Sequence, residues 1–113
     1  MHEMALCQSV IDIIEEEAKR HAFSRVRGVW LEIGALSPVE LEALRFGFDV
    51  VSRNTLADGA HLEIVGVPGS GWCMHCAKTV AVVRRCDPCP DCGTYQLQII
   101  AGGDMRLKEL EVD

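Results

Sequence analysis

Five of the six cysteines in this sequence lie close together, at spacings that suit a metal ion. Cys73 and Cys76 form one CxxC motif, and Cys86, Cys89 and Cys92 form two overlapping ones. Two such motifs set apart by a hairpin can place four thiolates at the corners of a tetrahedron, an arrangement that zinc favours. In a reducing compartment, clustered cysteines indicate metal more often than disulfides. A disulfide pair or a redox dithiol is the alternative interpretation.

The second pair of zinc ligands is predicted to be Cys89 and Cys92, which leaves Cys86 spare. Gly93 follows directly, and glycine permits the tight backbone turn that directs N–H groups at a cysteine sulfur. The four predicted zinc ligands are therefore Cys73, Cys76, Cys89 and Cys92. Four thiolates fill the coordination sphere, whereas a catalytic zinc keeps one position open for water. The sequence thus predicts a structural zinc.

The first residues offer a different set of donors. If Met1 is retained with a free amine, that amine, the amide nitrogen of His2 and the His2 imidazole can close two adjacent chelate rings on one metal ion. The amide nitrogen must lose its proton, which Cu(II) and Ni(II) promote, and both ions favour square-planar or tetragonal nitrogen sites. Glu3 offers a further donor through its amide or its carboxylate. From chemistry alone, a solvated terminal histidine is the competing interpretation.

An amphipathic helix is predicted to carry this chain start. Residues 3–21 have an apolar face at helical spacing, made of Leu6, Val10, Ile13, Ile14 and Ala18. Charged residues cover much of the remaining surface of the helix. Cys7 lies on this helix, and we interpret it as a small buried apolar residue.

A strand and a second helix are predicted to follow. Residues 25–34 alternate between apolar and other side chains, as in a half-buried strand. Ser37 is then predicted as an N-cap, with Pro38 at the first helical position and Glu40 completing a capping box. The apolar face of this second helix is predicted to comprise Leu41, Leu44, Phe48 and Val51.

The remaining chain divides at two glycine-rich segments. Residues 60–67 are predicted to form a strand, and residues 68–71 are predicted to form a linker. Residues 105–112 are predicted to form a last strand that returns to the first domain. In the cysteine-rich segment, 79–84 and 95–100 are predicted to form a hairpin. The sequence therefore predicts an α/β fold, with two helices, a small mixed three-stranded sheet and an inserted zinc-ribbon-like module. The predicted domains are an α/β domain over residues 1–68 and 103–113 and a zinc-binding module over 69–102.

Composition restricts the class of protein. The chain has 113 residues and a formal net charge of −6, which disfavours binding to the phosphates of nucleic acids. It opens without the basic and apolar segments of a signal peptide, and no apolar run approaches the roughly 20 residues that span a bilayer. We therefore expect a cytoplasmic protein that binds neither nucleic acid nor membrane.

Four segments together resemble the HypA/HybF family of hydrogenase maturation factors, which help to insert nickel. They are the start MHEMALCQS, the strand VWLEIGALS over residues 29–37, the pairs Cys73–Cys76 and Cys89–Cys92 with Gly93, and the ending LKELEV over 107–112. The resemblance extends over the whole chain.

This resemblance implies that Met1, His2 and Glu3 hold Ni(II) as transient cargo, and that the two CxxC pairs hold a structural Zn(II). Glu40 matches a position with a carboxylate near nickel, although capping explains it equally well. The implied partners are the GTPase HypB and the large-subunit precursor of a [NiFe]-hydrogenase. The implied function is that of a nickel metallochaperone, which is not an enzyme, as a monomer or homodimer. The alternative is a zinc-ribbon adaptor that binds proteins and delivers no nickel.

Overall fold

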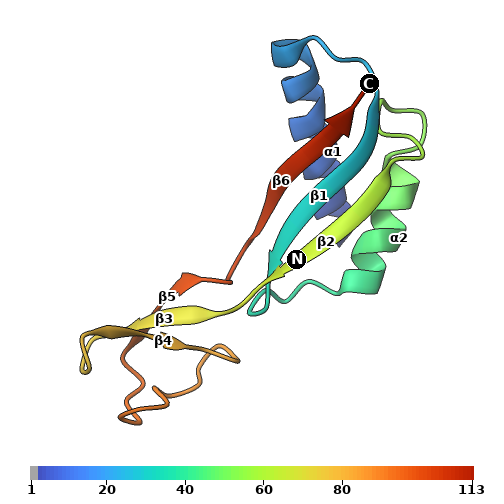
Figure 1. The fold of residues 1–113 in the computed structure, drawn as a ribbon. Helices are drawn as coiled ribbons and strands as arrows, with labels where there is room; N and C mark the ends of the chain where they lie inside the picture. The colour runs from blue at the N-terminus through green and yellow to red at the C-terminus, as the bar shows by residue number, and fades with distance from the viewer. Residues whose placement is uncertain (1–2) are drawn as a thin grey trace. The chain divides into compact units, whose positions relative to one another are not determined.

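The computed structural model describes residues 3–113, so Met1 and His2 lie outside the described part of the chain. The elements are α1 (Glu3–His21), β1 (Val26–Gly34), α2 (Leu41–Val51), β2 (His61–Val67), β3 (Ser70–Cys73), β4 (Lys78–Ala81), β5 (Leu97–Ala101) and β6 (Met105–Val112). They form two three-stranded sheets, with strand orders β2-β1-β6 and β4-β3-β5 (Figure 1).

The residues divide into two compact units. The first, which we call the helical unit, comprises three segments: the chain up to Leu31, then Pro38–Glu63 and Leu107–Asp113. We call the second the cysteine unit; it comprises Glu32–Ser37 and Ile64–Arg106. No helix in residues 3–113 is both long and apolar enough to cross a bilayer.

The sheet β2-β1-β6 is mixed, as the sequence predicted. Strands β1 and β2 run in the same direction and β6 runs against them (Figure 1). In β1, the alternating apolar residues Val29, Leu31 and Ile33 are buried. The final strand does return to β1, which confirms the predicted α/β fold.

The buried face of α1 is displaced from the predicted one. The fully or nearly fully buried side chains are Cys7, Val10, Ile11 and Ile14. The predicted core residue Ile13 is instead 47% exposed. Apolar residues border the predicted apolar face of α1 on both sides. Contact with α2 determines that the side with Cys7 is the buried one. The Cys7 thiol donates a hydrogen bond to the carbonyl oxygen of Leu44, at 3.3 Å.

The start of α2 differs from the predicted capping box. The helix begins at Leu41, and Glu40 is its N-cap, with a carboxylate that accepts from the Glu42 backbone N–H at 3.3 Å. The prediction gave the Glu40 backbone N–H to the Ser37 hydroxyl. In the structure, that N–H donates to the Glu3 carboxylate at 3.2 Å. The cap is thus local but lies at Glu40 instead of Ser37. Glu3, which is distant in sequence, accepts the hydrogen bond that the prediction gave to Ser37.

The apolar face of α2 is partly as predicted. Leu44 and Phe48 are buried, whereas Leu41 is 44% exposed at the first turn. Gly47 lies against α1, because a Cβ atom there would lie 2.9 Å from the Met4 sulfur and 3.2 Å from the Cys7 sulfur. Close approach of the two helices therefore depends on the small residue at position 47.

The sheet of the cysteine unit corrects two predictions. Strand β3 lies between β4 and β5 and pairs antiparallel with both, so 79–84 and 95–100 do not pair with each other as a hairpin. The predicted linker over 68–71 contributes its last two residues to β3. Gly71 is buried, and a Cβ atom there would lie 3.1 Å from the Val82 side chain. Glycine at this position is thus explained by packing within a central strand.

Candidate metal centre

The two CxxC motifs form a pair of similar turns. Cys73 ends β3, and the Ala77 N–H donates to the Cys73 carbonyl at 2.8 Å. In the second motif, the Gly93 N–H donates to the Cys89 carbonyl at 2.9 Å. Ala77 and Gly93 both have positive φ angles, of 53° and 78°. Each motif therefore closes on a left-handed residue that directly follows its second cysteine, a conformation that glycine adopts without strain.

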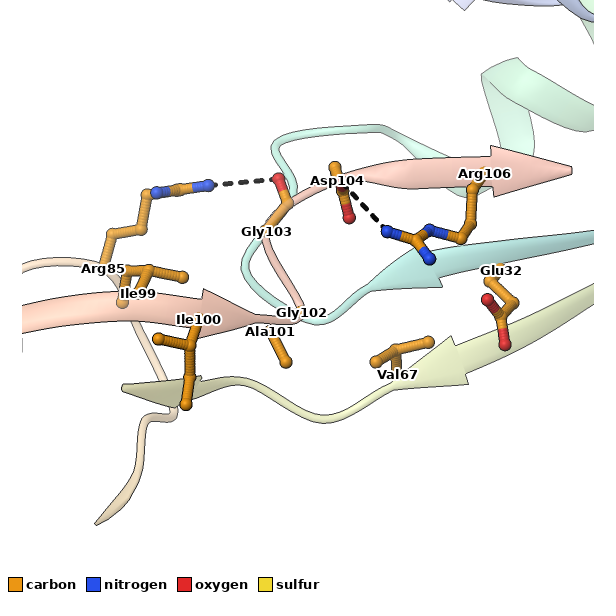
Figure 2. A pocket seen from close by; sticks show the side chains of 10 residues that line it. All are labelled: Glu32, Val67, Arg85, Ile99, Ile100, Ala101, Gly102, Gly103, Asp104 and Arg106. Carbon is orange, nitrogen blue, oxygen red and sulfur yellow. Dashed lines mark hydrogen bonds and ion pairs between the residues drawn. The ribbon is translucent and has the colours of Figure 1, made fainter. Parts of the chain in front are cut away.

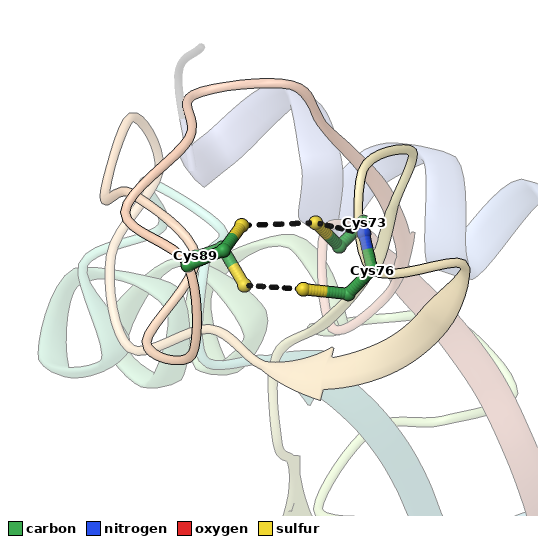
Figure 3. Close-up of side chains that lie close together, drawn as sticks. Cys73, Cys76 and Cys89 are labelled. Carbon is green, nitrogen blue, oxygen red and sulfur yellow. Dashed lines mark hydrogen bonds between the residues drawn. The ribbon is translucent and has the colours of Figure 1, made fainter.

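The structure brings the sulfur atoms of Cys73, Cys76, Cys89 and Cys92 within 4.8 Å of one another. The Cys73 and Cys92 sulfur atoms are 3.7 Å apart. Those of Cys76 and Cys89 are 4.0 Å apart (Figure 3). Zinc–sulfur bonds of about 2.3 Å in a tetrahedron place sulfur atoms about 3.8 Å apart. All four are free cysteines, and these separations exceed the S–S bond length of about 2.0 Å in a disulfide. The geometry is consistent with a zinc-ribbon module.

Backbone N–H groups also point at the sulfur atoms. The Cys76 N–H donates to the Cys73 sulfur at 3.3 Å, and the Asp91 N–H donates to the Cys89 sulfur at 3.4 Å. Such bonds stabilise thiolates, which are the form that binds a metal. The donor set contains sulfur alone, which suits zinc better than magnesium or calcium.

Two thiols of the cluster have pKa values shifted in opposite directions. A hydrogen bond with the Cys92 thiol, followed by burial, raises the pKa of Cys76 to about 12. Burial also acts to raise the pKa of Cys89, but the backbone N–H groups of Asp91 and Cys92 outweigh it and lower the value to about 7. One thiol of the cluster therefore ionises readily while its neighbour keeps its proton. A bound dication is what allows all of them to ionise together.

Cys86 and His75 lie outside this cluster. Cys86 is exposed and has a φ angle of 71°, and His75 is exposed within the first motif. An ion pair between Lys78 and Asp91, which was not predicted, joins β4 to the second motif. No spacing signal marks this pair, because Lys78 and Asp91 lie far apart in the sequence, one in β4 and the other in the second motif.

We expect the cysteines of zinc-loaded protein to differ sharply in reactivity. Burial and the nearby Glu3 charge raise the pKa of Cys7 to about 11, so its thiolate should be about 100-fold rarer near neutral pH than that of an ordinary thiol. Ellman's reagent should therefore titrate Cys86 rapidly and Cys7 slowly, with the other four appearing once a chelator removes zinc. Cys86→Ser should abolish the rapid phase. Three or more rapid thiols before chelation would contradict this assignment.

The structure covers only part of the predicted nickel site. Met1 and His2 lie outside the described residues. Glu3 and Glu40 are brought together, since the Glu3 carboxylate accepts a hydrogen bond from the Glu40 backbone N–H at 3.2 Å. The start of α1 is thereby attached to the N-terminus of α2, within the helical unit.

A pocket of about 510 Å³ lies elsewhere in the cysteine unit, and no cysteine lines it (Figure 2). Glu32, Asp104 and Arg106 are among the residues that line it, and Asp104 and Arg106 form an ion pair at 3.9 Å. The groups of this ion pair are largely exposed and neutralise one another. The pocket is therefore distinct from the cluster of thiols and shows no comparable set of converging donors.

Comparison with known proteins gives a consistent result. A family described as "Hydrogenase/urease nickel incorporation, metallochaperone, hypA" matches residues 1–112. The hydrogenase maturation factor HypA of Alkalilimnicola ehrlichii is 62% identical over 113 residues, and that of Azotobacter chroococcum mcd 1 is 50% identical; both matches cover 100% of each chain. The solution structure of the Ni metallochaperone HypA from Helicobacter pylori aligns with a TM-score of 0.78 and 26% identity, over 99% of this chain and 97% of that one. The chain belongs to the HypA family.

Proposed function

We propose that this protein is a nickel metallochaperone for the maturation of [NiFe]-hydrogenase. The observation that carries the proposal is the family match over residues 1–112, to a family described by nickel incorporation. The relatives that cover the full chain are named hydrogenase maturation factors. The protein thus acts by binding and transferring a metal ion rather than by catalysis, and it works in the cytoplasm as a monomer or homodimer.

The proposed nickel site is built on the start of the chain. The Met1 amine and the His2 amide and imidazole supply adjacent nitrogen donors, with Glu3 and Glu40 beside them. The contact between Glu3 and the Glu40 N–H supports this proposal, because it holds both residues near the start of α1. A site with few protein donors suits transfer, since a partner can replace one ligand at a time.

The proposed zinc site is structural and comprises Cys73, Cys76, Cys89 and Cys92. The separations among their sulfur atoms support zinc, and four thiolates leave no position for a reacting water molecule. We assign the zinc site to a module over residues 69–102 and the nickel site to a domain over 1–68 and 103–113. The proposed partners are the GTPase HypB, which assists delivery, and the hydrogenase large-subunit precursor, which receives the ion.

The test is metal stoichiometry on untagged protein that begins at Met1. Wild-type protein should bind nickel and one zinc, whereas His2→Ala should lose at least about tenfold in nickel affinity and keep its zinc. His75→Ala is the matched control, because it removes another histidine at an exposed position. One additional residue before Met1 should abolish the chelate as His2→Ala does.

Equal nickel uptake by the wild type, His2→Ala and the extended protein would overturn the proposed nickel site. A zinc-ribbon adaptor predicts that result, with zinc content unchanged in all three proteins. Nickel affinity should also fall with acidity, because the amine, amide and imidazole must each be deprotonated to bind.

A further inference from the structure

Three backbone segments of the cysteine unit approach one another closely at Gly34, Gly69 and Gly102. A Cβ atom on Gly34 would lie 2.0 Å from the Gly102 carbonyl oxygen, and one on Gly102 would lie 2.6 Å from the Gly69 Cα. The Gly34 N–H donates to the Asp104 carbonyl, and the Leu36 N–H donates to the Gly102 carbonyl, at 2.9 and 2.8 Å. We call the segments around Gly34, Gly69 and Gly102 the glycine crossing.

Arg85 bridges two segments of this crossing. Its Nε donates to the Leu36 carbonyl at 3.2 Å, and its Nη2 donates to the Gly103 carbonyl at 3.1 Å. Figure 2 shows the side chain extending to Gly103. A guanidinium group can hold two acceptors in a fixed geometry, which the single ammonium of lysine cannot reproduce. The two carbonyls belong to parts of the chain that are distant in sequence, so the contact fixes tertiary structure.

Arg85 also lies on the path from β4 to the second pair of cysteines. Earlier on that path, the Val82 N–H donates to the Gly69 carbonyl at 3.0 Å, which ties the chain to the crossing. Beyond Arg85, the chain turns at Cys86, where φ is 71°, and the Asp87 N–H donates to the Arg84 carbonyl. The Arg85 contacts therefore fix the chain about halfway between Val82 and Cys89.

We propose that Arg85 is a positioning residue for the four-cysteine centre. By bridging Leu36 and Gly103, it holds in place the loop that carries Cys89 and Cys92. These two cysteines then lie against the first CxxC motif. The inference rests on the proposed zinc site. Shortening the free loop by about half lowers the entropy cost of closing it, roughly a threefold effect on zinc retention. Loss of two charge-assisted hydrogen bonds adds to this, so removal of the guanidinium should speed zinc loss by about five- to tenfold.

The relation between Arg85 and zinc is reciprocal, because binding energies are linked. If the bridge favours zinc binding, zinc must favour the bridge by the same factor. Removal of zinc from wild-type protein should therefore speed hydrogen exchange of the Gly34 and Leu36 amides, which lie in the crossing. In Arg85→Gln, those amides should exchange faster already, and zinc removal should change them less.

The experiment compares Arg85→Gln with Arg84→Gln, both loaded with one zinc. Arg84 is the matched control, because its side chain is 82% exposed and its ion pair is a local one, with Asp87 at 3.8 Å. Transfer of zinc to a coloured chelator should be about five- to tenfold faster for Arg85→Gln and unchanged for Arg84→Gln. Arg85→Lys should be intermediate, and it serves as the test if Arg85→Gln does not fold.

Two results would overturn the proposal. Equal transfer rates from zinc-loaded Arg85→Gln, Arg84→Gln and wild type would show that the bridge does not position the ligands, while leaving the zinc site intact. Amides of the crossing that respond equally to zinc removal with and without Arg85 would show that the two features are not linked. Wild-type protein that binds no zinc would overturn the zinc site itself and this inference with it.

Discussion

Cys89→Ser is expected to eliminate high-affinity zinc binding and to unfold much of the cysteine unit. Cys89 is 2% exposed and lies with Cys73 and Val80 in a small core. So small a core gives little stability of its own, and structural zinc contributes about 10–16 kcal/mol in zinc-finger peptides. The variant should bind no zinc in a chelator competition that wild-type protein survives, and amides of β3, β4 and β5 should lose protection from hydrogen exchange.

Cys86→Gly is the control for this experiment. It also removes a thiol from the cysteine-rich loop, but Cys86 is exposed, and its φ angle of 71° suits glycine better than cysteine. We expect one zinc per chain and stability equal to or slightly above that of wild type. Loss of zinc from Cys86→Gly together with retention by Cys89→Ser would show that the ligands are assigned to the wrong cysteines.

Gly34→Ala is expected to destabilise the protein strongly. The new Cβ atom would lie 2.0 Å from the Gly102 carbonyl oxygen and 2.1 Å from its carbon. These are backbone atoms, so no side-chain rotation relieves the overlap, and the segments of the crossing must separate. We expect a loss of about 3 kcal/mol or more in the free energy of unfolding, and a melting temperature lower by roughly 12–24 °C.

Gly66→Ala provides the comparison for Gly34→Ala. Gly66 lies in β2, and a Cβ atom added there would have nothing within 4 Å, so alanine should be neutral or slightly stabilising. Thermal unfolding followed by circular dichroism distinguishes the two variants. Melting temperatures for Gly34→Ala and Gly66→Ala that agree within a few degrees would contradict the close packing described for the crossing.

The elements with strong periodicity were predictable from sequence. Residues 3–21 and 105–112 form α1 and β6 with the predicted bounds, and β1 and β2 begin one residue later than predicted. A long amphipathic pattern fixes such elements, because one face must be buried. The pattern did not determine whether the side of α1 with Cys7 or the side with Ile13 is buried, because that depends on the contact with α2.

Elements that depend on distant partners were not predictable. The cap of α2 comes from Glu40 itself, and the Glu40 N–H bonds to Glu3, which no local motif encodes. Strand β3 contains Ser70 and Gly71, which have low strand propensity and which resemble a linker. Pairing on both sides with β4 and β5 makes this segment a central strand, and pairing of this kind is a tertiary property.

The candidate site shows the same division. Cysteine spacing was enough to propose the four clustered thiols, because the CxxC turn is local and Gly93 marks its end. The equivalent turn at Ala77, the ion pair of Lys78 with Asp91 and the contacts of Arg85 have no signal in spacing. The proposed nickel donors Met1 and His2 stay predictions, since they lie outside the described residues.

The pairing of Ser70 with Ala101 places the entry and exit of the intervening segment side by side. Gly69 and Gly102, the residues just outside that pair, also approach each other closely. A segment whose two ends meet can be excised and the gap joined by a short turn, or grafted between neighbouring strands of an unrelated scaffold.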